Sequence, residues 1–487
     1  MRRLATQGGV YALGNAAVKA GGLLLAPLYL NLLTEEGYGY FALLDATARL
    51  LVMVAGVGVA AALLRFLTHE DQGIAEADRE GLPFTALITV IGAAGVALGL
   101  VWVAAPAIAP ILLDATDEGA WLVRLMGLYV CFKVAESVPL MWLRVRERPL
   151  LFVGATLGEL TVLIGGVYVL LGQQGRGLTG VMEAYVLSSL VGATVLVGGL
   201  LTQVPWQLQR HLVRRLVVFG WPLVLAGLAS MFLSLGDRYL LKLLTDAATV
   251  GIYDWSARLG GVLNLLFVQS FQMAFAVIGL KTLREGPEGL RLYRRVFRHY
   301  VIWTGWGVLG LSLLALDVTD LVSDRSAYFA ADYLVLPIAL GYFAYGLYFI
   351  ALNRLLASNK TPAIAGLVMA AAGVNVALNL ILIPTLGALG AALATTAAYG
   401  FLCALTMRSA QRLERVDYAW PQAALVLGLV ALLWGASVPT ADWPVGLRRL
   451  ARSGLIVLYL PLLLLLRLYT PSEVRQAWAW LQARRRS

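Results

Sequence analysis

The sequence has little charge for its length. Asp, Glu, Lys and Arg make up 14% of the 487 residues, and 60% of the residues are hydrophobic. A soluble protein of this size would have about 25% charged residues. No long polar block separates the hydrophobic stretches. The composition therefore excludes a water-soluble protein and predicts one membrane domain over nearly the whole chain.

Cysteine and histidine are rare, which limits the possible chemistry. Cys131 and Cys403 both lie in apolar runs, so we expect no disulfide framework. The histidines lie in or beside polar loops without the spacing of metal ligands, so we expect no metal. No phosphate-binding loop of the GxxxxGK[ST] type is present. We therefore expect no cofactor and no ATP-driven step.

Long apolar runs take up most of the chain. Each of about fourteen runs is long enough to cross the hydrocarbon core as a helix. The first run is too long for a signal-peptide core, so we expect it to remain as a helix. The predicted helices cover residues 8–33, 38–66, 82–104, 119–143, 150–171, 178–201, 216–242, 249–280, 297–316, 328–356, 362–383, 386–407, 420–437 and 447–467.

Basic residues are concentrated in alternate loops. Because positive loops remain in the cytoplasm, this distribution predicts that both termini are cytoplasmic. It also accounts for the net charge of +10 without a nucleic-acid partner. The predicted cytoplasmic loops hold Arg144, Arg146 and Arg148, then Arg210, Arg214 and Arg215, then Lys281 to Arg298, and then Arg408, Arg412 and Arg415.

The sequence repeats with an offset of about 210 residues. Residues 29–41 and 239–253 both read Leu-Leu-Thr, an acidic residue, a short gap, and then glycine and an aromatic residue. The repeat predicts two six-helix lobes, and an even number of crossings makes them parallel. Such lobes enclose a central cavity in many transporters and rock against each other. The predicted domains are residues 1–210, 211–412, the two additional helices at 413–470, and a basic amphipathic cytoplasmic tail at 471–487.

Several segments resemble the bacterial polysaccharide flippases of the multidrug/oligosaccharidyl-lipid/polysaccharide exporter superfamily. The segments are NVALNLILIPTLGALGAALAT at 375–395, LLTEEGYGYFALL at 32–44 and GDRYLLKLLTDAATVGIYDWSARL at 236–259. The resemblance implies an all-α, MATE-like fold in the inner membrane. It also implies transport of undecaprenyl-pyrophosphate-linked sugar units, as in O-antigen and lipopolysaccharide biosynthesis. The partners it implies are membrane lipids and a polysaccharide polymerase or other assembly proteins.

Charged and amide side chains occur inside several apolar runs. Such residues are costly in a membrane and usually face a cavity or a partner. Arginine binds pyrophosphate through a planar fork of donors, and nearby carboxylates would hold the arginines in place. We therefore expect a cavity formed by Asn15, Lys19, Asp45, Arg49, Asp254, Arg258, Gln269 and Gln272. Further candidates, for ion coupling or gating, are Glu136, Glu159, Glu183, Asp237 and Arg238.

Other interpretations fit parts of the same pattern. Asp45 with Arg49, and Asp254 with Arg258, are spaced four residues apart and would neutralise each other between packed helices. A lipid II flippase or a cation-coupled multidrug exporter are alternative functions. A membrane enzyme is disfavoured because no predicted outer loop is longer than about fifteen residues. A scaffold would not explain charges in both lobes.

Overall fold

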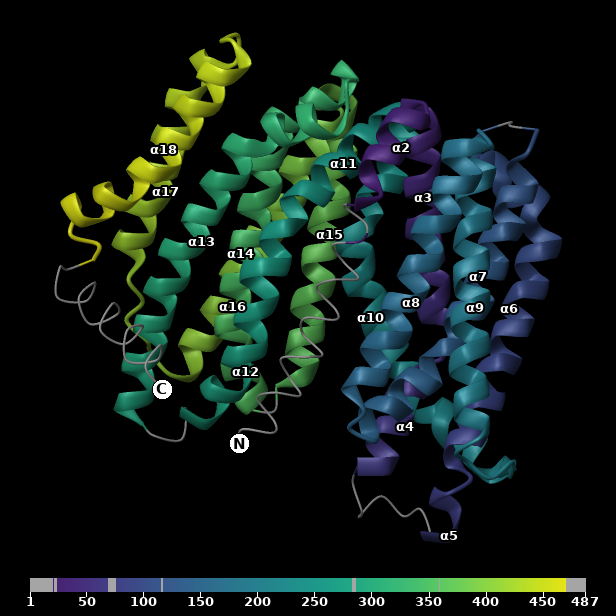
Figure 1. Ribbon diagram of the computed structural model, residues 1–487. Coiled ribbons are helices and arrows are strands. Elements are labelled where there is room, and N and C mark those ends of the chain that lie inside the picture. The colour runs from purple at the N-terminus through teal and green to yellow at the C-terminus, as the bar shows by residue number, and fades with distance from the viewer. Residues whose placement is uncertain are drawn as a thin grey trace, which may run out of the picture. The chain divides into compact units, whose positions relative to one another are not determined.

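The computed structural model describes residues 21, 24–68, 76–114, 117–282, 286–358 and 360–469, and every element in these ranges is a helix (Figure 1). Among the described residues, 12 helices are long and apolar enough to span a membrane. They coincide with the second to thirteenth runs predicted from the sequence, from Glu35–Ala55 to Trp420–Thr440. The all-α membrane fold is therefore confirmed.

The ends of the chain are described only in part. Most of the predicted first helix, residues 8–33, lies outside the described residues, as does the predicted tail at 471–487. Of the first helix, the short segment Ala26–Leu32 is described as α2. The predicted last helix, residues 447–467, corresponds to α18, Val445–Leu465.

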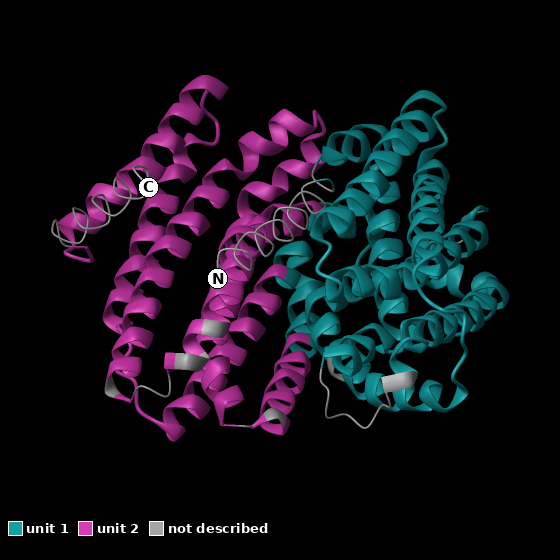
Figure 2. Cartoon of the chain, turned by 60° about the horizontal axis from the view of Figure 1, so that its bottom comes forward, with its two compact units in different colours: residues 1–254, 376–391 teal, residues 255–375, 392–487 magenta. Residues whose placement is uncertain are grey.

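The chain divides into two compact units (Figure 2). Unit 1 comprises residues 1–254 and 376–391, and unit 2 comprises residues 255–375 and 392–487. The six-helix lobes at 1–210 and 211–412 stay a prediction. The elements that begin in unit 1 are α2 Ala26–Leu32, α3 Glu35–Ala55, α4 Val59–Thr68, α5 Glu76–Arg79, α6 Leu82–Leu113, α7 Gly119–Val145, α8 Pro149–Val167, η1 Tyr168–Gln173, α9 Gly177–Leu201, α10 Arg210–Leu244, α11 Ala247–Leu263 and α16 Ala388–Leu413. Those that begin in unit 2 are η2 Asn264–Gln269, α12 Ser270–Thr282, α13 Pro287–Val322, η4 Ser326–Ala330, α14 Ala331–Ala357, α15 Thr361–Leu386, α17 Trp420–Ser437, η5 Val438–Thr440 and α18 Val445–Leu465.

In each unit one long helix has several neighbours. In unit 1, α7 packs against α3, α4, α6 and α9. In unit 2, α13 packs against α14, α17 and α18. In the described part of the chain, two helices include a π-helical turn: η1 follows α8, and η2 joins α11 to α12. Four of the charged residues described below lie on the two long helices, Lys133 and Glu136 on α7 and Asp317 and Asp320 on α13.

The start of α3 shows why the Leu-Leu-Thr segment ends one helix and begins the next. The Thr34 side chain accepts a hydrogen bond of 2.9 Å from the Gly37 N–H and so caps the helix. Glu35 and Glu36 follow in the first turn, where negative charge interacts favourably with the helix dipole. The same local signals position the membrane run that carries Asp45 and Arg49.

The predicted helix at 38–66 is interrupted, contrary to the sequence expectation. Val57 and Gly58 adopt positive φ angles of 48° and 66°, and α4 begins at Val59. The reason is a close backbone contact in unit 1. A Cβ on Gly58 would lie 2.4 Å from the carbonyl oxygen of Gly220, on α10. The break therefore lets α10 approach the chain at a point where no side chain fits.

Gly39 makes a similar contact between α3 and the first turns of α11. A Cβ on Gly39 would lie 1.7 Å from the carbonyl oxygen of Ala247, and one on Gly251 would lie 2.6 Å from that of Glu35. Because the obstructing atoms are backbone, the helices themselves would have to separate. We expect Gly39→Ala to lower the free energy of unfolding by about 1–3 kcal/mol.

Reversible unfolding of the purified protein in mixed micelles measures this effect. Gly92→Ala is the matched control, because no atom lies within 4 Å of its added Cβ on α6. Alanine there is expected to be neutral or stabilising, by up to about 1 kcal/mol from helix propensity. Equal free energies of unfolding for Gly39→Ala and Gly92→Ala would contradict the close contact between Gly39 and the backbone of Ala247.

Candidate functional site

Asp45 and Arg49 form an ion pair near the middle of α3. The distance from Arg49 Nη2 to Asp45 Oδ2 is 2.9 Å, and the side chains are 56% and 15% exposed, respectively. The carboxylate is thus held against the helix while the guanidinium remains accessible. Local i,i+4 spacing alone produces this pair, as expected from the sequence.

A buried charge cluster, the Arg238 triad, consists of Asp237, Arg238 and Asp254. Arg238 Nε donates to Asp254 Oδ1 at 2.8 Å, and Arg238 Nη1 lies 3.1 Å from Asp237 Oδ1. All three residues are buried. The triad joins α10 to α11, so Asp254 has a partner on another helix, which the i,i+4 interpretation did not identify.

Two tyrosine hydroxyls complete the triad. Tyr38 on α3 donates to Asp254 Oδ2 at 3.3 Å, and Tyr253 donates to Asp237. Each carboxylate thereby has a donor in addition to Arg238, as a buried charge requires. Tyr38 and Tyr253 could not be selected from the sequence, because aromatic residues are common in membrane helices.

Tyr239 connects the α3 pair with the triad. Its hydroxyl lies 2.8 Å from the Thr47 Oγ1, on the same helix as Asp45. Tyr239 also interacts electrostatically with Arg238 and Asp45. Three of the predicted residues, Asp45, Arg238 and Asp254, therefore belong to one polar region of unit 1.

A second cluster, the Lys133 cluster, consists of Lys133, Glu136 and Glu159. Lys133 Nζ donates to Glu136 Oε2 at 2.6 Å and to both carboxylate oxygens of Glu159 at 2.9 Å. It lies where α7, α8 and α9 pack together. A Cβ on Gly192 of α9 would lie 2.7 Å from Glu136 Oε1, so glycine leaves the space that this carboxylate occupies.

Tyr129 lies one turn before Lys133 on α7, between the Lys133 cluster and the ion pair of α3. It interacts electrostatically with Asp45, Arg49 and Glu159. Its ring centroid is 5.3 Å from that of Tyr185 on α9. Unit 1 thus places the predicted residue Glu159 near the α3 pair, through an aromatic residue that the sequence did not single out.

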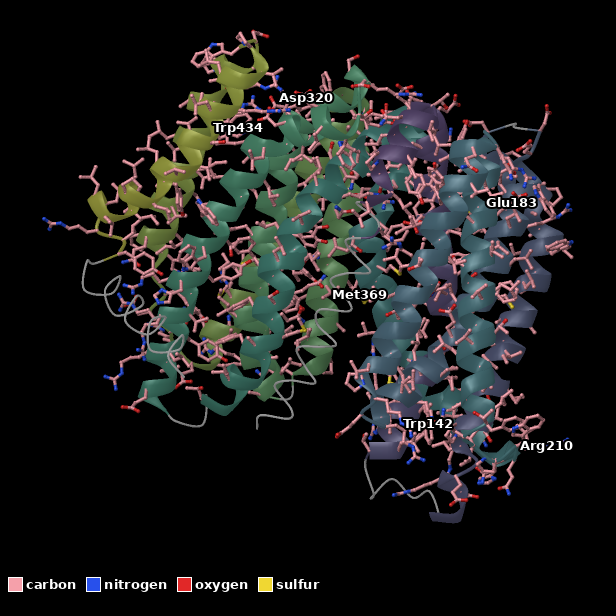
Figure 3. All side chains as sticks on the ribbon, in the orientation of Figure 1. Trp142, Glu183, Arg210, Asp320, Met369 and Trp434 are labelled. Carbon is pink, nitrogen blue, oxygen red and sulfur yellow. The ribbon has the colours of Figure 1, made fainter. Side chains whose placement is uncertain are left out.

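Not every predicted residue belongs to these clusters. Glu183 lies near the other end of the unit 1 helices from Trp142 (Figure 3) and pairs with Arg176 at 2.5 Å. Asn15 and Lys19 lie outside the described residues. The remaining three belong to unit 2, where each is half-buried: Arg258, Gln269 and Gln272.

Lys242 lies at the end of α10 beside the end of α6. It donates to Asp114, which also accepts a hydrogen bond of 2.8 Å from the Tyr40 hydroxyl. Both donors favour the ionised carboxylate and hold the pKa of Asp114 below its usual range. This contact ties two helix ends together, which is consistent with a structural role for Lys242.

Unit 2 contains a third group of charges, on α18. Arg448 bonds Asp317 at 3.0 Å and also Asp320, both on α13. Arg452 bonds Asp332 of α14 at 2.6 Å. These pairs attach the additional C-terminal helices to α13 and α14 and are distinct from the predicted cavity residues.

The fold is shared with solved membrane transporters. The lipid II flippase MurJ in an inward closed conformation aligns with a TM-score of 0.76 and 11% identity, over 93% of this chain and 98% of its own. An inward-facing MATE family multidrug resistance transporter aligns with a TM-score of 0.68 and 13% identity, over 81% and 94% of the two chains. A MOP superfamily transporter from Pyrococcus furiosus, described as having a binding pocket of reverse polarity, aligns with a TM-score of 0.60 and 14% identity, over 84% and 95%.

These similarities and the twelve apolar helices define the class. The protein is a multi-pass membrane protein with the fold of the flippases and transporters of the MOP superfamily. At the level of sequence, the model of one family, described as polysaccharide biosynthesis protein, matches residues 4–277. The chain belongs to this family. No curated protein sequence matches it.

Proposed function

We propose that the protein is a flippase for undecaprenyl-pyrophosphate-linked oligosaccharides. It moves them from the cytoplasmic to the outer leaflet of the bacterial inner membrane by alternating access. One observation carries the proposal: in a member of the polysaccharide biosynthesis family, a membrane helix exposes a guanidinium group, that of Arg49, near its middle. This is the group expected to bind the anionic linker that these substrates share.

The position of Arg49 favours contact with water over contact with lipid. A lipid-facing arginine at the centre of a membrane helix costs about 2.5–3.5 kcal/mol on insertion scales. An aqueous, substrate-filled space avoids this cost. Asp45, one turn earlier, orients the guanidinium at 2.9 Å and keeps the empty site near neutral. The fork of N–H donors then binds pyrophosphate oxygens when substrate enters.

The membrane potential would supply part of the driving force. With a negative cytoplasm, outward movement of an anion is favoured by about 2.3 kcal/mol per charge per 100 mV. In this proposal both termini are cytoplasmic, the lipid tail remains in the bilayer, and a polymerase or other assembly protein takes over the delivered glycan. Lipid II is a second candidate, because it has the same type of pyrophosphate linker and the fold aligns with a flippase named for it.

Transport in proteoliposomes tests the role of Arg49. The substrate is a fluorescent oligosaccharide on a prenyl pyrophosphate, and the readout is its accessibility to an external glycosidase. We expect Arg49→Ala to slow transport by about tenfold to a hundredfold, as for loss of a charged hydrogen bond of about 1.5–3 kcal/mol. Arg49→Lys should restore part of the rate, because it keeps the charge but not the fork.

Arg412→Ala is the matched control, since Arg412 is an exposed arginine in the last turn of α16. It should transport at the wild-type rate. Normal transport by Arg49→Ala would refute the role of the guanidinium. Faster transport of lipid II than of other linked glycans would favour the second candidate.

A further inference from the structure

The Lys133 cluster carries one more negative charge than positive charge when both carboxyl groups are ionised. Lys133 is the one cation among its three members, and it bonds both Glu136 and Glu159. Glu136 is 1% exposed and Glu159 is 17% exposed. A net negative charge in the interior of a membrane helix bundle is unfavourable, because little water is present to solvate it. The cluster therefore needs one additional positive charge.

The geometry shows where this charge is missing. Lys133 bonds Glu136 through Oε2, whereas Glu136 Oε1 is buried and no donor among the described residues reaches it. The same ammonium nitrogen bonds both carboxyl groups, at 2.6 Å for Glu136 and 2.9 Å for Glu159, so the two groups lie side by side. Both also approach Gly192, whose Cβ would lie 2.7 Å from Glu136 Oε1 and 3.4 Å from the Glu159 carboxyl carbon. A hydrogen atom between the carboxyl groups would supply the absent donor.

We propose that Glu136 and Glu159 form a site that binds one exchangeable proton, held between the two carboxyl groups and closed by Lys133. The proton comes from water and forms one O–H bond. Its binding changes the charge of the cluster from minus one to zero, and its release reverses this change. The role of the cluster in coupling protons to transport rests on the proposed flippase function. Binding of the proton itself does not depend on that function.

A proton fits this site better than a metal ion does. The Lys133 ammonium already occupies the position at which both carboxylates converge, and it would repel a second cation. Among the described residues, no three His, Cys, Asp or Glu side chains are grouped as metal ligands. Sodium would need several oxygen ligands, whereas a proton needs only the two carboxyl oxygens.

Few other ionisable groups of the described residues lie near the cluster. On α7 the neighbouring group is Tyr129, and on α9 it is Tyr185, whose ring packs against Tyr129. The α3 pair, Asp45 and Arg49, interacts with Tyr129 and is neutral as a pair. The span of α6 contains no charged residue, and on α4 Arg65 lies over the Phe219 ring. None of these groups supplies a charge that balances the Lys133 cluster.

Release of the proton would affect helix packing directly. The cluster lies among α7, α8 and α9, and a net charge there requires water or separation of these helices. The neutral cluster allows close packing. The proton would thus couple the ionic state of unit 1 to the arrangement of three of its helices, and an imposed pH gradient would bias that arrangement.

Infrared difference spectroscopy on the purified protein tests the site without any substrate. A protonated carboxyl group has a C=O stretching band that is resolved from the bands of carboxylate. We expect such a band from the Lys133 cluster in the wild type at neutral pH, with loss of the band as the pH is raised. Glu136→Gln and Glu159→Gln should each abolish it, because the remaining carboxylate is balanced by Lys133.

Two further variants sharpen the test. Lys133→Gln removes the cation, so we expect the protonated band to persist to higher pH. Glu288→Gln changes an exposed carboxylate on α13 and should leave the band unchanged. Both Glu→Gln variants retain side-chain size and a neutral cluster, so we expect both to fold. Size-exclusion chromatography checks this.

The outcomes separate the site from the function. Absence of the band in the folded wild type, or its persistence in Glu136→Gln, would overturn the site. Loss of the band on replacing choline chloride with sodium chloride would identify a sodium site and also overturn it. Coupling is tested by transport: the wild-type rate should depend on pH, and that of Glu136→Gln should not. Equal pH dependence would refute coupling, whereas a wild type that transports at no pH would refute the proposed function and leave the infrared result standing.

Discussion

Replacing Arg238 with alanine is expected to lower the free energy of unfolding by about 3–5 kcal/mol, the range for removing one partner of a buried ion pair. Arg238 is the cation shared by Asp237 and Asp254, at 3.1 and 2.7 Å. Its loss leaves two carboxylates buried near each other without a balancing charge. Unfolding of the purified protein in mixed micelles, followed by circular dichroism, measures the effect.

A matched arginine provides the control. Arg49 also pairs with an aspartate at similar distance, but its side chain is 56% exposed. We expect Arg49→Ala to change stability by less than about 1 kcal/mol, as for exposed ion pairs. Adding Asp237→Asn and Asp254→Asn to Arg238→Ala should recover part of the loss, because the uncompensated charges are gone. Similar stabilities of Arg238→Ala and Arg49→Ala would contradict burial of the triad.

Replacing Arg452 with alanine is expected to have an effect of similar size, about 3–5 kcal/mol, on unit 2. Arg452 is 1% exposed and bonds Asp332 through both terminal nitrogens, at 2.6 and 3.2 Å. It also donates to the carbonyl oxygen of Leu313 and to the hydroxyl of Thr440, each at 3.3 Å. One side chain therefore joins α18 to α13, α14 and η5.

Arg449 on the same helix serves as the comparison. It is 47% exposed and lies 3.6 Å from Asp317, so Arg449→Ala should cost less than about 1 kcal/mol. Limited proteolysis of the C-terminal helices, together with the unfolding curve, would show whether α18 detaches first in Arg452→Ala. Unchanged protease resistance and stability in that variant would show that Arg452 does not attach α18.

The membrane helices were predictable because their signal is local. An apolar run of sufficient length is a property of the sequence itself, and twelve predicted runs coincide with helices of the structure. The ion pair of Asp45 and Arg49 was predictable for the same reason, since i,i+4 spacing brings the two side chains together on one helix. Both features need no knowledge of how helices pack.

Features that depend on a second helix were not predictable. The helix is interrupted after Ala55 because the backbone at Gly58 packs against Gly220, which is far away in the sequence. Asp254 meets Arg238, sixteen residues earlier, because α10 and α11 pack together. Glu136 and Glu159 were recognised as candidates, but nothing in the sequence ranked them above Glu183. Their convergence on Lys133 depends on the packing of α7 and α8.

The π-helical turn η2 affects how this protein aligns with its relatives. A π-helical turn holds its hydrogen bonds between residues five apart, so it contains one residue more than an α-helical turn. Side chains after Gln269 are therefore rotated by about 100° from the positions that an uninterrupted helix starting at Ala247 would give them. A relative without the wide turn would match this helix only with a one-residue gap. Arg258 lies before this turn and Gln272 lies after it. An alignment that matches both residues to their counterparts in such a relative must therefore include the gap.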